Sequence, residues 1–328
     1  MMSPSDEGLD AMSRDPATVP NLSIVIVSWN EWPKLQQCLT SIYRSTLPAV
    51  EVTVIDNASS DGTPDFIRTQ FPSVHLHCNR RNLGATKALN FGFARARGEF
   101  VLKLDADTEL MSDCIDRLLE FLRRDPDVDV VGPRTFNTDG TIQETARHFP
   151  GALSGLFGRQ STLTRWFPNN PISRRYLARQ FLDSTEPFEV EQVGGAFMLF
   201  RRHLLSEVGF LDEGYYHYWD DTDWCWRLRA AGKRIFCVPA AEIFHHEGNA
   251  RGKRKRPKRI WMFHYNAYRF YTRWQTLGYW DPRSVLAGSA LLSRALLLMA
   301  YHSLPRRHSE VAAPPLAPST TFQRPVKP

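Results

Sequence analysis

The chain has 328 residues, of which 42% are hydrophobic and 12% are aromatic. Such a chain can bury a large core, so its composition excludes wholesale disorder, a collagen-like or coiled-coil protein and a disulfide-dependent mini-protein. Lys and Arg total 41 against 35 Asp and Glu, and the positive charge is concentrated, because seven of the nine residues from Arg251 to Arg259 are basic.

The cysteines and the first residues favour a cytoplasmic protein. The five cysteines are scattered and form no Cys-x-x-Cys pair, which predicts neither a disulfide framework nor a zinc site. Residues 1–20 carry acidic side chains and no apolar run, so we expect a disordered leader instead of a secretory signal.

Folding signals begin at Leu22, where a nearly continuous apolar run predicts a strand over 22–28 that is buried on both faces. Further strands are predicted over 50–56 and 74–78, and the segments between the three have helical spacing. This alternation predicts a parallel sheet, and ligands bind such sheets at the carboxyl ends of the strands.

The same alternation continues with a helix over 86–96, a strand over 99–104, a helix over 112–124 and a strand over 128–131. Residues 150–187 show no clear periodicity, which leaves an ordered loop region or a mobile lid as alternatives. Regular signals return with a strand region over 190–201, a turn over 209–214, a helix over 220–231 and a strand over 234–238.

The composition changes after residue 250. A basic run over 251–259 is followed by an aromatic run over 261–280 and by an apolar stretch over 285–301. We expect that stretch, which contains Arg294, to fall short of the roughly 20 apolar residues of a spanning helix. The predicted parts are therefore the leader, a main α/β domain over 21–250, a helical extension over 251–310 and a disordered, proline-rich tail over 311–328.

Two carboxylates one residue apart, Asp105 and Asp107, follow the predicted strand that ends in VLKL. Carboxylate oxygens suit Mg²⁺ or Mn²⁺, and such a cation can neutralise a diphosphate. Solvated acids with this spacing are common by chance, but the position at the end of a buried strand favours a cation site. His245 and His246 also follow a strand, and one of them could complete the coordination.

A second polar group follows the strand that ends at Asp56. For Asp56 we favour hydrogen bonding to a base or ribose over a purely structural role, whereas Asp61 has the pattern of a turn or helix-capping residue. Farther along, Asn82-Leu83-Gly84 predicts a glycine turn against which a nucleotide could lie, although such a turn is as often a plain loop.

A third group is Asp220, Asp221 and Asp223, at the start of a predicted helix. The helix dipole stabilises acids there, which accounts for Asp220 as a cap and for Asp223 as the partner of Arg227. Asp221 then points elsewhere. It is a candidate general base, because partial burial among Trp and Tyr side chains raises the pKa of a carboxyl group.

Together these segments resemble family 2 glycosyltransferases of the GT-A fold, and among them the rhamnosyltransferase-like branch. The resemblance covers residues 22–248, and the segments that carry it are, in order, IVIVSWN, VTVIDNASSDGT, NRRNLGATKALNFG, GEFVLKLDADTEL, VGGAFMLFRR, GFLDEGYYHYWDDTDWCWRLRAAG and IFHHEG. Each alone is modest evidence, whereas seven in this order are highly specific. The implied fold is α/β, with a Rossmann-like, mostly parallel sheet flanked by helices.

The resemblance implies an inverting transfer of a sugar such as rhamnose from a nucleoside diphosphate donor to a hydroxyl group of a glycan or lipid-linked acceptor. It implies Asp221 as the base and Asp107 with His245 (alternatively His246) as ligands of Mg²⁺ or Mn²⁺. The implied donor-binding residues are Asn30, Asp56 on the base, Asn82, Gly84, Asp105 on the ribose or diphosphate, and Gly195. Relatives often read Asn-Pro-Asp and Glu-Asp where this chain has Asp105-Ala106-Asp107 and Asp220-Asp221. Both changes keep the acidic side chains, and they leave open whether the donor is a dTDP- or a UDP-sugar.

The basic and aromatic runs after residue 250 have three interpretations. They form a solvated charged face, a nucleic-acid patch or an element that binds a membrane surface. No RNA- or DNA-binding motif accompanies them, which disfavours the second. We favour a peripheral contact with anionic lipid at the inner face of the cell membrane, which suits an acceptor on a polyprenyl carrier.

Three other functions are weighed against a glycosyltransferase. A nucleotidyltransferase can share such a sheet but needs a Gly-rich, Arg-containing loop after the first strand, where residues 28–33 read SWNEWP. A dehydrogenase is disfavoured because no G-x-G-x-x-G follows a strand. An inactive sugar-nucleotide-binding or membrane-bound interaction protein would not need Asp105, Asp107 and Asp221, which are all present.

Overall fold

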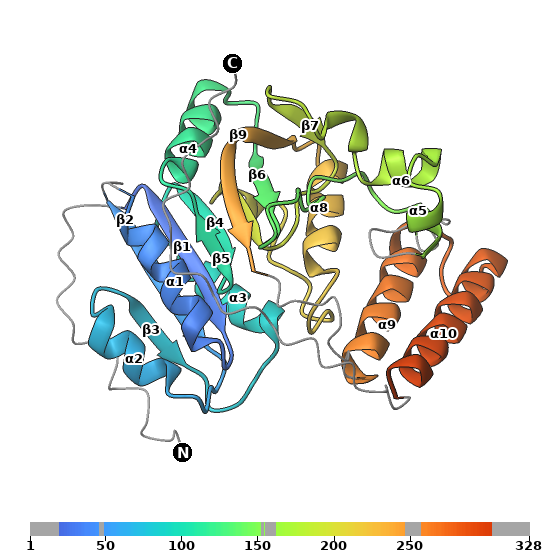
Figure 1. The fold of residues 1–328 in the computed structure, drawn as a ribbon, viewed down its shortest axis with the longest axis horizontal. Coiled ribbons are helices and arrows are strands. Elements are labelled where there is room, and N and C mark those ends of the chain that lie inside the picture. Colours follow the sequence, from blue (N-terminus) through green and yellow to red (C-terminus); the bar gives the residue numbers. More distant parts are fainter. Residues whose placement is uncertain (1–19, 46–48, 152–153, 155–161, 247–256, 304–328) are drawn as a thin grey trace.

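The computed structural model describes residues 20–45, 49–151, 154, 162–246 and 257–303. The predicted tail over 311–328, nearly all of the predicted leader and most of the basic run lie outside the described residues. Within the described part, nine strands form one sheet with helices on both of its faces (Figure 1).

The first half of the sheet is parallel, because a helix separates its successive strands. It contains β1 (Leu22–Ser28), β2 (Val50–Asp56), β3 (His75–Cys78) and β4 (Phe100–Asp105), in the spatial order β3-β2-β1-β4. The connecting helices are α1 (Trp32–Tyr43), α2 (Thr63–Gln70) and α3 (Ala85–Phe93). In this register Asp56 lies beside Ser28 and Asp105 beside Val27, so the two acids end the strands on either side of β1.

The second half of the sheet is mixed. Its strands are β5 (Thr108–Leu110), β6 (Val130–Phe136), β7 (Phe188–Val190), β8 (Phe197–Arg201) and β9 (Ile235–His245). β8 runs antiparallel to β4 and β6, while β5 and β7 run antiparallel to β9, so the other six strands share one direction. The sheet is therefore mostly parallel, as expected. The sequence prediction contains neither the three-residue β5 nor the reversed direction of β8. A strand as short as β5 leaves no periodic pattern.

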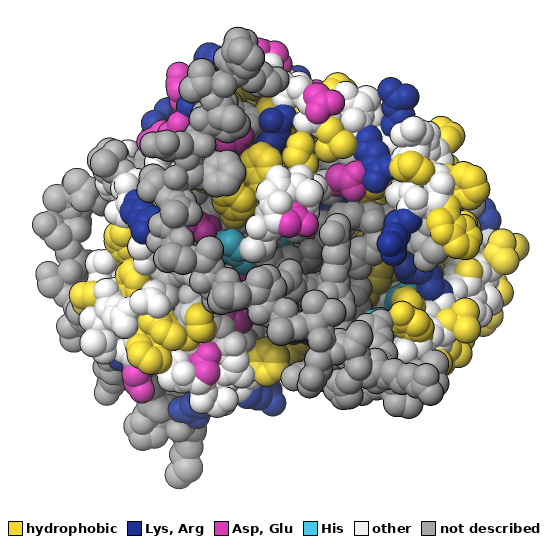
Figure 2. Space-filling view, in the orientation of Figure 1, with side chains coloured by type: hydrophobic (Ala, Val, Ile, Leu, Met, Phe, Trp, Pro, Cys, Tyr) yellow, Lys and Arg dark blue, Asp and Glu magenta, His cyan; other side chains and the backbone are white. Residues whose placement is uncertain are grey.

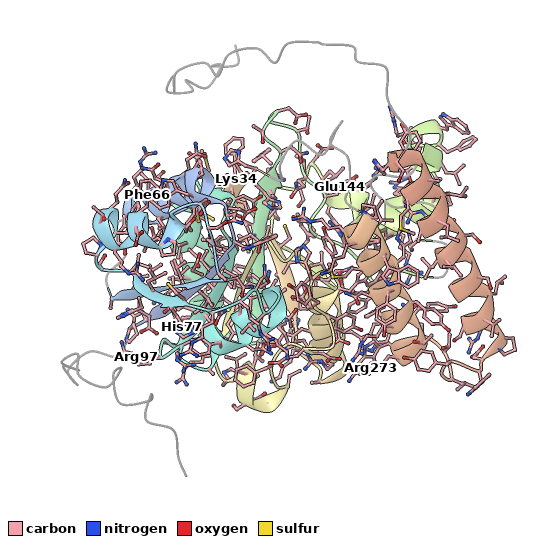
Figure 3. All side chains as sticks on the ribbon, turned by 90° about the horizontal axis from the view of Figure 1, so that it is seen from below. Lys34, Phe66, His77, Arg97, Glu144 and Arg273 are labelled. Carbon is pink, nitrogen blue, oxygen red and sulfur yellow. The ribbon has the colours of Figure 1, made fainter. Side chains whose placement is uncertain are left out.

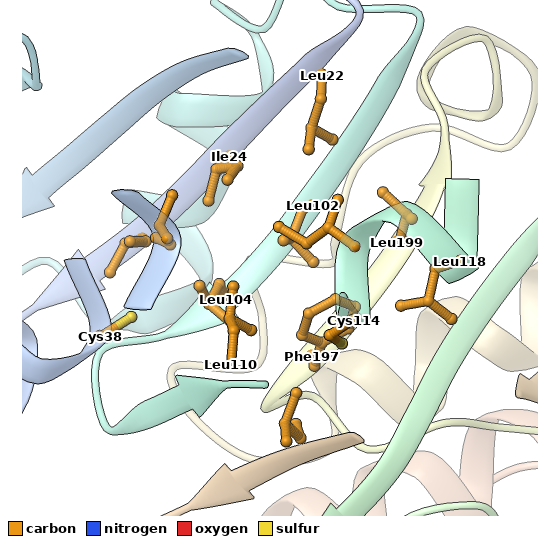
Figure 4. Packing of buried hydrophobic residues seen from close by; sticks show 14 of the residues in the cluster. Leu22, Ile24, Cys38, Leu102, Leu104, Leu110, Cys114, Leu118, Phe197 and Leu199 are labelled. Carbon is orange, nitrogen blue, oxygen red and sulfur yellow. The ribbon is translucent and has the colours of Figure 1, made fainter. Parts of the chain in front are cut away.

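The core lies on both faces of β1, whose side chains alternate between them. Ile24 and Ile26 pack with α1 and α4 (Cys114–Arg124), whereas Val25 packs with α3 and α8 (Asp220–Ala230) on the opposite face. Figure 4 shows Leu102 and Leu118 within the first of these clusters. Burial on both faces explains why the β1 sequence is apolar throughout.

The described parts of the segment over 150–187 are ordered as short helices, namely α5 (Thr162–Trp166), α6 (Pro171–Tyr176) and the 3-10 helix η1 (Arg179–Phe181). Another short helix, α7 (Leu204–Glu207), follows β8.

Two long helices, α9 (Pro257–Trp274) and α10 (Pro282–Ser303), lie side by side at the end of the molecule farthest from β3 (Figure 1). With 22 residues, α10 is the one helix among the described residues that is long and apolar enough to cross a membrane, by length and composition. The expectation that this stretch is too short is therefore wrong. The helix extends beyond the apolar run at both ends, from Pro282 to Ser303.

Candidate active site

Two carboxylates and an imidazole come together where β4 and β9 end. Asp105 is the last residue of β4, Asp107 precedes β5, and His245 ends β9, which pairs with β5. One ligand atom from each of the three residues lies within 4.8 Å of the other two. Two hard oxygens and an imidazole nitrogen fit a Mn²⁺ or Mg²⁺ ion.

Two nitrogen groups hold the Asp107 carboxylate. Its Oδ1 lies 3.1 Å from His245 Nε2, and its Oδ2 accepts a 3.0 Å hydrogen bond from Lys34 Nζ. Burial alone raises the pKa of Asp107, but His245 and Lys34 outweigh it and hold that pKa well below its usual range. The carboxylate is therefore charged at neutral pH and suited to a cation.

Gln143 sets the orientation of the His245 ring. Its Oε1 lies 2.8 Å from His245 Nδ1, and its Nε2 donates to Asn137 Oδ1 at 3.0 Å, which fixes the amide orientation. Since Oε1 only accepts, Nδ1 carries a hydrogen, and Nε2 is the ring nitrogen that faces Asp107 and would bind a cation. The ring of His246 instead lies 3.1 Å from Glu109 Oε2.

Lys34 was not predicted from the sequence. It lies in the first turn of α1 (Figure 3). Besides Asp107, its Nζ contacts the carbonyl oxygen of His246 at 2.8 Å. The helix dipole disfavours a cation in a first turn, so an acid at the ends of the neighbouring strands accounts for its position. A lysine directly after Trp-Pro at a helix start was the available signal.

Asp221 is connected to the carboxylate of Asp105 through a buried lysine. Asp221 Oδ2 accepts a 2.8 Å hydrogen bond from the Gly195 amide, and the carbonyl oxygen of Gly195 accepts one from Lys103 Nζ. The same Nζ lies 3.4 Å from Asp105 Oδ1. Burial lowers the pKa of Lys103, but Asp105 and then Asp220 outweigh it and keep the ammonium charged. A charged residue inside the apolar run VLKL was a signal for this role.

Gly195 has no room for a side chain. A Cβ there would lie 2.8 Å from Asp221 Oδ2 and 2.9 Å from Lys103 Nζ, closer than real Cβ contacts. The glycine therefore allows the carboxylate and the ammonium to approach the same peptide.

The predicted capping role of Asp220 is wrong. The N-cap of α8 is Trp219, in a left-handed backbone conformation, so Asp220 is already helical, and it is buried. That burial, and next the charge of Asp221, raise the pKa of Asp220. The predicted pair of Asp223 and Arg227 is confirmed at 3.0 Å.

Asp56 lines a cavity of about 630 Å³ between the ends of β2 and β3 and the start of α2, together with residues that include Ser59, Arg68 and Cys78. Its side chain is 1% exposed; Oδ2 accepts from the Ser59 amide at 2.9 Å, and Oδ1 has no hydrogen-bond partner among the described residues. A buried acceptor without a partner costs about 1–3 kcal/mol, so this oxygen indicates a ligand that brings a donor.

The cavity lining includes neither Asp107 nor Asp221. Asp56 and Asp105 are nevertheless separated only by β1, or two strand spacings of about 4.8 Å each. That separation suits an extended ligand with a base at one end and a diphosphate at the other. Asn30 adjoins the cavity, since its Oδ1 accepts from the Ser60 amide at 2.7 Å.

Asn82 and Gly84 form the turn before α3, as expected. Asn82 Oδ1 accepts hydrogen bonds from the Gly84 amide at 2.9 Å and from the Tyr216 hydroxyl at 2.8 Å. Gly84 has φ +90°, and a Cβ there would lie 2.7 Å from the Tyr216 ring. The turn thus packs against the loop that leads to α8, and a donor-binding role for Asn82 and Gly84 stays a prediction.

Residues 23–209 match the family model described as Glycosyl transferase family 2. The chain is 31% identical over 243 residues to an N-acetylglucosaminyl-diphospho-decaprenol L-rhamnosyltransferase of Mycobacterium tuberculosis, covering 71% of this chain and 78% of that protein. It is 25% identical over 201 residues to a poly-beta-1,6-N-acetyl-D-glucosamine synthase of Staphylococcus epidermidis, covering 59% of this chain and 42% of that protein.

Two solved structures share the fold. A mannosyltransferase from Pyrobaculum calidifontis in complex with GDP-Man and Mn²⁺ has a TM-score of 0.53 and 20% identity, over 89% of this chain and 76% of that chain. GalNAc-T7 with UDP, GalNAc and Mn²⁺ has a TM-score of 0.54 and 19% identity, over 89% of this chain and 60% of that chain. At these identities the likeness shows the GT-A fold alone.

Proposed function

The chain belongs to glycosyl transferase family 2 and is a glycosyltransferase; on that premise we propose that it transfers a sugar from a nucleoside diphosphate to an acceptor hydroxyl group with inversion at the anomeric carbon. The observation that carries this proposal is the position of Asp105. Its carboxylate belongs to the cluster of Asp107 and His245, and Lys103 together with the peptide groups of Gly195 links it to Asp221. A cation site and a candidate base thus meet at one residue.

Asp107 and His245, with Asp105 beside them, are the residues that would hold Mg²⁺ or Mn²⁺. When bound, such an ion acts as a Lewis acid that offsets the charge of the departing diphosphate, an effect worth several kcal/mol. The two similar structures hold Mn²⁺, in agreement with this assignment.

Asp221 is the general base. It removes the proton from the acceptor hydroxyl group as that oxygen attacks the anomeric carbon from the face opposite the nucleotide. The bond from that carbon to the diphosphate breaks, and its electron pair leaves with the diphosphate. The Gly195 amide orients the carboxylate through Oδ2. A positioned base contributes about 10²- to 10⁴-fold to the rate.

Asp56 binds the base of the donor. Its free, buried Oδ1 requires an N–H donor, which uracil and thymine each present at the imide nitrogen. This agrees with a UDP- or dTDP-sugar. Rhamnose is the sugar we propose, because the relative with 31% identity is named as an L-rhamnosyltransferase.

The acceptor is lipid-linked, and α10 brings the enzyme to it. The relative is named for a substrate on decaprenol, and the side chains of Trp280, Leu286 and Leu297 are 95%, 74% and 71% exposed. Hydrophobic side chains gather along the edge of the molecule that contains α9 and α10 (Figure 2). Arg294 lies 3.1 Å from His264 of α9, which leaves the outer surface of α10 after Arg283 mostly apolar. We assign this surface to the inner face of the cell membrane.

The test is a transfer assay with UDP-, dTDP- and GDP-sugars, a polyprenyl-diphosphate-linked N-acetylglucosamine acceptor and either Mn²⁺, Mg²⁺ or EDTA. We expect metal-dependent transfer, with the anomeric configuration of the product inverted in its NMR spectrum. A retained configuration, or equal rates in EDTA, would overturn the mechanism. An absence of binding to anionic liposomes would overturn the membrane contact.

A further inference from the structure

Helix α9 contacts the segment that leads to Asp221, and both lie after residues 23–209, which match the family model. α8 lies between the sheet and α9 (Figure 1). The face of α9 that points toward α8 therefore adjoins the turn over 217–219, which sets the direction in which α8 begins.

That turn is strained. Tyr218 has φ +68° and Trp219 has φ +71°, two successive left-handed conformations in residues with bulky side chains. Side chains of this kind rarely adopt such angles, so the surrounding structure has to hold them. Asp221 comes two residues after Trp219, and its position depends on this turn.

One side chain of α9 binds the turn directly. Asn266 is 2% exposed, and its Nδ2 donates to the carbonyl oxygens of His217 at 2.9 Å and Tyr218 at 3.2 Å. The amide group has two hydrogens, and these two oxygens use both of them. Neither acceptor belongs to α9. The bonds therefore connect the helix to the turn, whereas a polar side chain that only fills space would bond within its own helix.

Aromatic packing and a second hydrogen bond hold the rest of the segment. The ring of Trp219 packs against Phe263 and Phe270 of α9, with centroids 5.8 and 5.4 Å apart. Beyond the turn, Trp274 Nε1 donates to Asp223 Oδ1 at 2.7 Å. The residues on both sides of Asp221 are thus fixed to one helix, while its carboxylate stays directed at Gly195.

We propose that Asn266 is a positioning residue of the transfer reaction. By fixing the turn over 217–219, it holds the carboxylate of Asp221 where it removes the proton of the acceptor. This inference rests on the proposed role of Asp221 as the base. It extends the functional unit to α9, so that the enzyme requires this helix for chemistry in addition to any contact with lipid.

The experiment compares Asn266→Ala with Thr272→Val. Thr272 is a matched control, because it is a buried polar residue of α9 whose hydroxyl group donates to the carbonyl oxygens of Tyr268 and Arg269 in its own helix. We expect Asn266→Ala to lower kcat about 10- to 100-fold, as small displacements of reacting groups do. Donor KM and Mn²⁺ affinity should stay unchanged, and Thr272→Val should keep its kcat. Asn266→Gln, with a longer side chain that displaces the amide, gives the same test if the alanine variant does not fold.

A double-variant cycle separates positioning from general stability. In an Asp221→Asn background, Asn266→Ala should lower the residual rate no further, because the group that it positions is already gone. An unchanged kcat in the Asn266 variants, equal losses in kcat and donor affinity, or additive losses in the cycle would overturn the inference. If Asp221→Asn alone keeps its turnover, the proposed function fails instead.

Discussion

Two regions of the molecule position their carboxylates by different means. In the strand-end region, formed by β1–β4, the loops that follow them and the end of β9, Asp56 and Asp105 are the last residues of strands whose register is fixed by β1. In the helix-start region, formed by residues 209–230 and α9, Asp221 follows a strained turn. It depends on Gly195 and Asn266 from other parts of the chain. We therefore expect substitutions in the first region to change ligand binding and those in the second to change the rate of the chemical step.

The largest expected effect is that of Asp221→Asn. Without the base, kcat should fall by about 10²- to 10⁴-fold, while nucleotide binding and Mn²⁺ binding persist because the strand-end region is untouched. Steady-state kinetics gives the first quantity and isothermal titration calorimetry the others. Near-normal turnover would remove Asp221 as the base, and a loss of nucleotide binding would contradict the separation of the two regions.

Gly195→Ala tests the link between the regions. The new Cβ would lie within 2.9 Å of both Asp221 Oδ2 and Lys103 Nζ, so both groups have to move. We expect kcat to fall up to about 100-fold with little change in donor affinity. Gly151→Ala is the control, since no atom lies within 4 Å of a Cβ at that position. Equal kinetics for the two variants would show that Asp221 does not require this close approach.

Gln143→Leu tests the orientation of His245 in the strand-end region. The substitution removes the oxygen that lies 2.8 Å from His245 Nδ1 and frees the ring to rotate. Loss of such a partner weakens metal binding by about 10- to 100-fold, which Mn²⁺ titration followed by electron paramagnetic resonance would measure. His246→Gln is the comparison, because that ring faces Glu109 and should leave Mn²⁺ affinity unchanged. The reverse result would exchange the roles of the two histidines.

Asp56→Asn should have a smaller effect, confined to donor binding. If the single oxygen of the variant stays on the Ser59 amide, an NH₂ group takes the place of the free acceptor and faces the N–H donor of the base. A hydrogen bond to a charged group contributes about 1.5–3 kcal/mol, and the variant loses it. We expect the Kd of the nucleoside diphosphate to rise about tenfold, with kcat at saturating donor unchanged. A lowered kcat with an unchanged Kd would contradict a role of Asp56 in base binding.

The same contrast explains what could be predicted from the sequence. The first two strands were predicted at the bounds that they have, and a cation site of Asp105 and Asp107 with one of the two histidines followed from where their strands end. The preference for His245 came from the family resemblance. The left-handed conformation of Trp219 leaves no pattern, which is why Asp220 was mistaken for a cap.

Contacts between distant segments left no signal either. Asn266 is hydrogen-bonded to Tyr218, which lies 48 positions before it, and Gln143 is hydrogen-bonded to His245, which lies 102 positions after it. Each is a single polar residue whose partner is chosen by tertiary packing, and periodicity carries no information about that choice. Lys103 was not predicted either, although a lysine inside an apolar strand is a signal for a buried partner.

The smallest effect concerns stability and belongs to the strand-end region alone. Burial, and next the charge of Asp107, raise the pKa of Glu31 to about 7. Folding therefore favours its protonated form, and this contribution to stability is complete below the unfolded pKa and is lost as the pH rises through about 7. In EDTA, the free energy of unfolding of wild type relative to Glu31→Gln should fall by on the order of 1–3 kcal/mol between pH 5 and pH 8, as measured by urea unfolding. Parallel curves for the wild type and the Glu31 variant would mean that Glu31 is ionised in the folded protein throughout this range.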